Sequence, residues 1–386
     1  ATRLIVQGDY FRNLISGSLV CTGAHNTVIQ MGDATSGTQT FENYDDVTNL
    51  EVRTNGTITF PYPFRVVTNF TMTGTTTVLN IEDDLNLLSA NAVTIPAGVT
   101  VNVNNAAVFT VNGNLTVNGT LVINPGASLR MGNGRTLTVG TTGTLKLLGA
   151  ATNVATLDST GAGSTFTANI NGNANFSYFR IQRMTAAGLN FSATATIQAL
   201  NNGEFHFFPT NGYAITLANA TSAPATMNNV GFFNDAAAAN VRNFNAAALL
   251  VGSAINITLD QYAGDESGQA NENSDTFNKI TWVGAAPTAL TLQNNTAAGF
   301  PPATIAANTT SLFTTFAFAL TATDTATDVR SVKVTMTGTA TSGEIANVLV
   351  YSDQVGVYNC QYNAGTDVLV GSGTPQGNPA TLDVAI

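Results

Sequence analysis

The stretch that decides the fold runs from Leu79 to Leu147 and reads LNIEDDLNLLSANAVTIPAGVTVNVNNAAVFTVNGNLTVNGTLVINPGASLRMGNGRTLTVGTTGTLKL. It repeats one unit ten times: two apolar residues flank one polar residue, and successive pairs start about six to eight residues apart. Because side chains alternate between the faces of a strand, both apolar members of a pair lie on one face. The Asn-Gly, Gly-Thr and Pro-Gly steps between the pairs are turn sequences. The ten pairs are Leu79/Ile81, Leu85/Leu87, Val93/Ile95, Val101/Val103, Phe109/Val111, Leu115/Val117, Leu121/Ile123, Leu129/Met131, Leu137/Val139 and Leu145/Leu147.

Strands this short cannot bury an apolar face alone, so a regular series of them is expected to wind into coils that stack on one another. Three strands per coil give roughly 20 to 24 residues, the size of a right-handed parallel β-helix coil. The sequence therefore predicts an all-β protein with a right-handed parallel β-helix (β-solenoid) over residues 51–284. Towards its end the coils widen to roughly 25 residues. The inward pairs expected there are Phe179/Ile181, Phe205/Phe207, Val230/Phe232 and Ile255/Ile257.

The composition favours an extracellular protein without nucleic acid as a partner. Only 9% of the 386 residues are charged and the net charge is −10, so no basic stripe is present to neutralise phosphates or anionic lipids. No apolar run reaches the roughly 18 residues of a membrane span. The start at Ala1 fits a mature chain secreted through a cleaved signal peptide.

Two cysteines, Cys21 and Cys360, lie near opposite ends of the sequence. In an oxidising compartment they are candidates for a disulfide, either within one chain or between neighbouring chains. Two unpaired buried thiols are the remaining alternative.

The first 50 residues and the last hundred do not follow the repeat. Within residues 1–50, a short strand and a second apolar cluster suggest either a cap over the open end of the solenoid or a donor strand that pairs with another subunit. The candidate cap or donor strand consists of Arg3, Leu4, Ile5, Val6, Gln7, Tyr10 and Phe11. Residues 285–386 contain alternating segments separated by Gly, Asp and Asn turns, a pattern typical of a β-sandwich.

Two stretches resemble modules of secreted bacterial surface proteins. Asn114 to Gly149, which begins NLTVNGTLVINPGASL, resembles the β-helix of large adhesins and surface repeat proteins, especially of Bacteroidetes-type bacteria. The segments DVRSVKV (328–334) and GEIANVLVY (343–351) resemble the immunoglobulin-like domains that follow such helices. The resemblance implies a surface protein in which a β-helix precedes an immunoglobulin-like β-sandwich.

One departure from that family suggests how the protein assembles. Such sandwiches continue past a strand like Leu382 to Ile386, whereas this sequence ends there. A sandwich that lacks a strand exposes an apolar groove and a sheet edge, and a strand donated by a neighbour would fill both. The segment Arg3 to Gln7 is the candidate donor. Because head-to-tail contact of this kind does not close on itself, it would build a filament of identical copies.

The strand Glu204-Phe205-His206-Phe207 is the best candidate for a polar surface site. Alternation turns Phe205 and Phe207 inward and leaves Glu204 and His206 outward, with Arg180 expected beside them one coil earlier. This group could be an acid/base pair of a polysaccharide-active enzyme. The favoured interpretation is an exposed ion-pair cluster, and no catalytic residue is predicted.

The acidic loop 260–275 is the only candidate metal site. Its oxygen-bearing side chains suit Ca²⁺, although their spacing matches neither the EF-hand nor the nonapeptide calcium repeat. A solvated loop is therefore favoured and no cofactor is expected, with calcium as the alternative. The possible ligands are Asp260, Asp265, Glu266 and Asp275, with Asn271, Glu272 and Asn273 between them.

These patterns predict a structural, non-enzymatic subunit of an extracellular filament or surface layer, assembled from copies of itself by donor-strand complementation. The alternatives are a monomeric carbohydrate-binding adhesin module, which would contact a glycan or cell surface, and, less favoured, a polysaccharide lyase or hydrolase.

Overall fold

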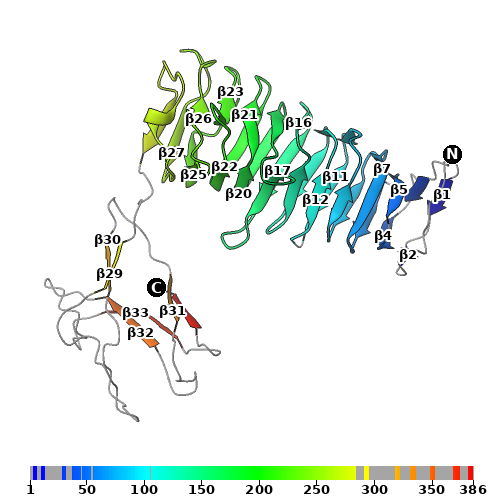
Figure 1. Ribbon diagram of the computed structural model, residues 1–386, viewed down its shortest axis with the longest axis horizontal. Helices are drawn as coiled ribbons and strands as arrows, with labels where there is room; N and C mark the ends of the chain where they lie inside the picture. The colour runs from blue at the N-terminus through cyan, green and yellow to red at the C-terminus, as the bar shows by residue number, and fades with distance from the viewer. Residues whose placement is uncertain are drawn as a thin grey trace, which may run out of the picture. The chain divides into compact units, whose positions relative to one another are not determined.

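The computed structural model describes residues 3–6, 10–13, 28–31, 37–44, 46–53, 55–104 and 106–283, and beyond them six strands between residues 291 and 385. The chain divides into two compact units, Ala1–Ala286 and Pro287–Ile386. The first unit is a solenoid of parallel strands with about 11 turns (Figure 1). Its one described helix is a single 3₁₀ turn, η1 (Gln269–Asn271).

Three columns of stacked strands form the sides of the solenoid, named here faces 1, 2 and 3. Along each face, strands of successive coils pair in parallel. Face 1 consists of β2 (Tyr10–Asn13), β4 (Thr38–Asn43), β6 (Thr57–Phe60), β8 (Val78–Ile81), β11 (Thr100–Val103), β14 (Thr120–Ile123), β17 (Thr144–Leu148) and the first halves of β20 (Asn173–Gln182) and β22 (Thr196–His206). Face 2 consists of the first half of β7 (Phe64–Met72), β9 (Leu85–Leu87), β12 (Val108–Val111), β15 (Ser128–Met131), β18 (Ala155–Ser159), the second halves of β20 and β22, and β25 (Val230–Phe233).

Face 3 is built in two blocks. The first contains β1 (Arg3–Val6), β3 (Val28–Met31), β5 (Val47–Val52) and the second half of β7. The second contains β10 (Val93–Ile95), β13 (Leu115–Val117), β16 (Arg135–Val139), β19 (Phe166–Ile170), β21 (Met184–Phe191), β23 (Tyr213–Leu217) and β26 (Arg242–Asn245). A small sheet of β24 (Thr226–Asn228), β27 (Ile257–Asp260) and β28 (Ile280–Val283) ends the solenoid.

The coil length predicted from the repeat is confirmed by the strand register. On face 1, Val78 lies opposite Thr100, Thr100 opposite Thr120, and Thr120 opposite Thr144, so these coils take 22, 20 and 24 residues. Further along, Ile181 lies opposite Phe205 and Phe205 opposite Phe232, which gives the wider coils of 24 and 27 residues.

The apolar pairs fill the inside of the coils. Every residue of the ten pairs between Leu79 and Leu147 is at most 4% exposed. In the wide coils, phenylalanine rings stack through the interior: the ring centroids of Phe179 and Phe205 lie 5.5 Å apart and those of Phe205 and Phe232 lie 5.4 Å apart. Burial of about 25 cal/mol for each square ångström of apolar surface makes this interior the main stabilising contribution.

Asparagine ladders join successive coils. Asn104 donates to the Glu82 carboxylate at 2.8 Å, and Asn124 donates to Asn104 at 2.6 Å. Similar amide contacts join Asn80 to Asn102 and Asn169 to Asn190. Asn104 donates to one neighbouring coil and accepts from the other, and the remaining amides each bond to one neighbouring coil, so these side chains help to fix the stacking register.

The structure differs from two sequence predictions within the solenoid. Parallel stacking begins at β1, since Arg3–Val6 lies opposite Val28–Met31, and not at residue 51. The apolar repeat is irregular there, so the pattern did not reveal these coils. Phe207 does not point inward with Phe205: its backbone has a φ of +53° and its side chain is 38% exposed. Strand alternation ends at His206, and Phe207 begins a corner.

The second unit contains three antiparallel strand pairs among its described residues. These are β29 (Thr291–Asn294) with β30 (Phe318–Thr321), β31 (Ser331–Thr335) with β34 (Thr381–Ala385), and β32 (Val348–Ser352) with β33 (Val368–Gly373). The all-β character expected for this part is therefore present.

Candidate functional site

The outward side of face 2 carries the main cluster of charged and aromatic side chains in the wide coils. Strand register places Arg180 opposite Glu204, as the sequence predicted, and Gln182 opposite His206. His206 in turn lies opposite Phe233 of the following coil. We call this group, together with the neighbouring side chains described below, the face 2 cluster.

A chain of charged hydrogen bonds runs through the cluster. Arg180 Nη2 donates to Glu204 Oε2 at 2.9 Å, and His206 Nε2 lies 3.0 Å from the same oxygen. On its other side, His206 Nδ1 lies 2.7 Å from Asp235 Oδ2. The imidazole therefore bridges two carboxylates from different coils, an arrangement that favours its protonated form.

A second, more buried ion pair adjoins this chain. The Asp158 side chain is 8% exposed and accepts from Arg183 Nη1 at 2.6 Å and from Gln182 Nε2 at 2.6 Å. It also accepts from the backbone N–H of Ser159 at 2.7 Å. With three donors around it, this carboxylate is fully compensated and ties β18 to the coil that follows.

The aromatic part of the cluster lies at the corner after the strands. The His206 imidazole stacks on Phe233, with centroids 4.9 Å apart and planes 13° apart. The guanidinium carbon of Arg183 lies 4.7 Å from the centroid of the Phe207 ring. Arg183 and Phe207 directly follow the paired residues Gln182 and His206, and their φ values are +59° and +53°. Their positive φ is therefore a recurring corner geometry, which brings a cation over an aromatic ring.

The alternation and spacing of the sequence predicted Glu204, His206 and Arg180 in this cluster, but not Asp158, Arg183 or Asp235. Asp158 lies at the end of a Thr/Ser-rich stretch where the repeat changes, and Arg183 and Asp235 lie just after strands, where alternation no longer indicates direction. No local pattern identifies such corner residues; only the coil register brings them together.

The charges of the cluster do not suit acid catalysis. The hydrogen bond from His206 lowers the pKa of Glu204 to about 2, partial burial opposes this, and Arg180 adds to the lowering. For His206, burial works against protonation, but the contacts with Glu204 and Asp235 outweigh it and raise the pKa. A glycosidase general acid needs a carboxyl with a raised pKa, whereas Glu204 stays ionised at all but very low pH.

The same shifts predict how stability depends on pH. Ionised Glu204 stabilises the folded chain: this stabilisation is present above the ordinary pKa of 4.5 and is lost as the pH falls through about 2. The contribution of His206 is complete below its ordinary pKa of 6.5 and is lost as the pH rises through its raised folded value. We therefore expect the cluster to stabilise the solenoid most between pH 4.5 and 6.5.

Thermal unfolding of wild type and His206→Gln at pH 5.5 and pH 8.5 checks this prediction. The midpoint temperature of unfolding should be clearly lower for His206→Gln than for wild type at pH 5.5, and the difference should be much smaller at pH 8.5. An equal loss at both pH values would mean that the charge of His206 does not stabilise the fold.

The aspartates of the acidic loop 260–275 accept hydrogen bonds from nearby backbone N–H groups. Asp275 accepts from the N–H groups of Lys279 and Ile280 at 2.9 and 2.8 Å, and Asp265 accepts from the N–H of Asn234 at 2.9 Å. Glu266 accepts from the Asn234 amide, and Asp260 lies at the end of β27. Within the described part of the chain, no three His, Cys, Asp or Glu side chains gather closely enough to hold a metal ion.

The candidate donor strand pairs within its own chain. Arg3, Leu4, Ile5 and Val6 form β1, which pairs with β3, and Tyr10 and Phe11 belong to β2, which pairs with β4. The Phe11 ring stacks on the buried Phe41 ring with centroids 4.9 Å apart. Gln7, Cys21 and Cys360 lie outside the described residues.

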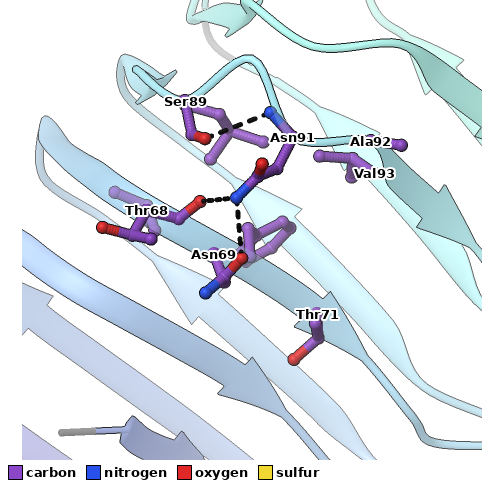
Figure 2. A pocket seen from close by; sticks show the side chains of 10 residues that line it. Thr68, Asn69, Thr71, Ser89, Asn91, Ala92 and Val93 are labelled. Atoms are coloured by element: carbon purple, nitrogen blue, oxygen red, sulfur yellow. Dashed lines mark hydrogen bonds between the residues drawn. The ribbon is translucent and has the colours of Figure 1, made fainter. Parts of the chain in front are cut away.

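A pocket of about 40 Å³ lies where the two blocks of face 3 meet. Among the described residues, no ladder joins β7 to β10. Instead, the Asn91 amide donates to the Thr68 carbonyl at 3.0 Å and to Asn69 Oδ1 at 2.9 Å (Figure 2). The volume suits a bridging water or two and is too small for a sugar ring.

Among the described residues, no helix combines the length and apolar character needed to cross a membrane. Comparisons with protein-family models, curated proteins and solved structures found no match to the chain.

Proposed function

We propose that the protein is a structural subunit of an extracellular filament or surface layer, in which the solenoid is a stiff rod. The observation that carries this proposal is the stack of coils, whose strands pair in parallel from β2 to β22 on face 1 and from β7 to β25 on face 2, with asparagine contacts between coils. A stack in which each coil contacts its neighbours resists bending along its whole length. The low charge of the chain and its resemblance to bacterial surface proteins support an extracellular location.

Copies of the chain join by strand exchange in this proposal. β1 lies at one end of the stack and pairs with β3 alone, through four residue pairs, so it can leave the solenoid without breaking the pairing between any other strands. Arg3 to Gln7 then pairs with the immunoglobulin-like sandwich that we propose for residues 285–386 of a neighbour. Main-chain hydrogen bonds to a sheet edge supply the affinity in such a joint.

Proline at Ile5 tests the exchange, because it removes a main-chain donor from the strand. Static light scattering should show large assemblies for the full chain and a loss of assembly for Ile5→Pro. Thr94→Ala, on the outward side of β10, serves as the control, and it should assemble normally. Unchanged assembly of Ile5→Pro would overturn the exchange.

Non-reducing electrophoresis adds a second test, since a ladder of multimers that collapses on reduction supports a bridge between Cys21 and Cys360 of neighbours.

A second function is favoured by the exposed aromatic group in the face 2 cluster. The Phe207 ring is exposed and contacts the Arg183 guanidinium, and the Arg180 and Glu204 side chains of the same cluster are 43% and 40% exposed. An aromatic ring next to charged hydrogen-bonding groups suits the apolar face and hydroxyl edge of a sugar. On a glycan array, Phe207→Ala should remove binding, whereas Phe277→Ala, which alters a ring of similar exposure elsewhere, should keep it. Equal binding by wild type and both variants would exclude this site.

A further inference from the structure

Face 2 carries a guanidinium that the face 2 cluster leaves without a partner. Arg130, on the outward side of β15, is exposed, and it lies opposite Thr110 of the preceding coil and Asp158 of the following coil. The Asp158 carboxylate binds Arg183 and Gln182 instead. Within the described part of the chain, the Arg130 guanidinium takes part in no ion pair or hydrogen bond. It is therefore free to bind a group from outside the protein.

The carboxylates of the face 2 cluster do not compete for this guanidinium, because each already has a basic partner. The pairs are Asp158 with Arg183 at 2.6 Å, Glu204 with Arg180 at 2.9 Å, and Asp235 with His206 at 2.7 Å. Arg130 is thus the basic side chain left over, in a chain whose net charge is −10. A guanidinium presents paired N–H groups that match the two oxygens of a carboxylate. The missing partner of Arg130 is therefore an anion, and a carboxylate fits it best.

Hydroxyl groups connect Arg130 with the cluster. Ser128, two residues before Arg130 on the same strand face, lies opposite Thr156, and Thr156 lies opposite Arg180 of the next coil. Both hydroxyl-bearing side chains are half-buried on the outward side of face 2. A hydroxyl both donates and accepts hydrogen bonds, as the hydroxyls of a sugar do. The surface between Arg130 and Arg180 is therefore suited to polar contacts with a glycan.

The distance from Arg130 to the exposed ring of Phe207 sets the size of the ligand. Arg130, Asp158, Gln182 and His206 belong to four successive coils, and Phe207 directly follows His206. Since neighbouring strands lie about 4.8 Å apart, three coil steps span roughly 14 Å along the solenoid. A ligand that contacts both Arg130 and Phe207 is therefore an oligomer and not a single sugar.

We propose that face 2 binds an acidic polysaccharide that lies along the solenoid from β15 to β22. A uronate carboxylate of the polysaccharide pairs with Arg130, and the apolar face of another sugar in the same ligand packs on the Phe207 ring. This inference rests on the glycan-binding function proposed above for the face 2 cluster, and it names the class of glycan. A neutral glycan would leave the Arg130 guanidinium without its anion.

Isothermal titration calorimetry of the full chain with an oligogalacturonate and with its methyl ester tests the proposal, because only the first ligand carries carboxylates. Wild type should bind the acid about fivefold more tightly than the ester at low salt, the size expected for an exposed ion pair. The preference should shrink as the salt concentration rises. Arg130→Gln should bind both ligands alike, whereas Phe207→Ala should weaken both. Arg53→Gln, which alters an exposed arginine just after β5, is the matched control and should behave like wild type.

The failure of this inference is distinguishable from the failure of the glycan-binding function. Equal binding of the acid and the ester by wild type would overturn the inference and leave glycan binding by the cluster intact. A preference for the acid that persists in Arg130→Gln would do the same. If wild type bound neither ligand, the inference would fall as well, and the glycan array with Phe207→Ala would decide separately whether the cluster binds another sugar.

Discussion

Phe205→Ala is expected to lower the free energy of unfolding of the solenoid by about 3–5 kcal/mol, as large-to-small changes of buried aromatic residues do. The Phe205 side chain is 0% exposed, and its ring lies between those of Phe179 and Phe232. Removal of the ring leaves a cavity inside rigid coils that cannot close over it. Urea denaturation followed by circular dichroism measures the loss.

The matched control is Phe207→Ala, two residues further along the same segment. Since Phe207 is exposed and its main partner is the Arg183 guanidinium, this change should cost only about 0.5–1 kcal/mol. Equal losses for the two variants would mean that both rings point inward, as strand alternation alone predicted, and that the corner is placed wrongly.

Gly98→Ala is expected to produce the second large loss, about 3 kcal/mol, because two costs combine. Gly98 has a φ of +82°, which residues with a Cβ rarely adopt, and an added Cβ would lie 1.9 Å from the Thr75 carbonyl oxygen of the preceding coil. The backbone of one coil must therefore move away from the other. Urea denaturation measures the loss, and amide hydrogen exchange of β8 and β11 locates it.

Two other glycines separate these costs. Gly134 has a φ of +68° but open space around its Cβ position, so Gly134→Ala should cost about 1–2 kcal/mol from the backbone conformation alone. Gly161 has open space and no positive φ, so Gly161→Ala should change stability by about 0.5 kcal/mol or less. If Gly98→Ala behaved like Gly161→Ala, the close stacking of the coils at this corner would be contradicted.

The sequence predicted the solenoid because one physical rule, the alternation of side chains along short strands, governs every coil between Leu79 and Leu147. The same rule failed at Phe207, where a positive φ ends the alternation. It also failed before residue 50: β1 and β2 stack like later strands, but the apolar pairs around them are irregular.

The candidate site was only half predictable for the same reason. Glu204 and His206 share a strand face, and going back by one coil length from Glu204 led to Arg180. Asp158 and Asp235 reach the cluster from other coils, next to corners whose lengths vary. Corner conformations and insertions decide which side chains meet there, and neither follows from periodicity.

Electron microscopy of the purified full chain tests the central claim most directly, because a rod that joins head to tail must build an extended object. We predict fibres or sheets with a regular axial repeat, which are lost in Ile5→Pro. A uniform field of separate single rods at high protein concentration, with wild type and Ile5→Pro alike, would contradict the structural role proposed for this chain.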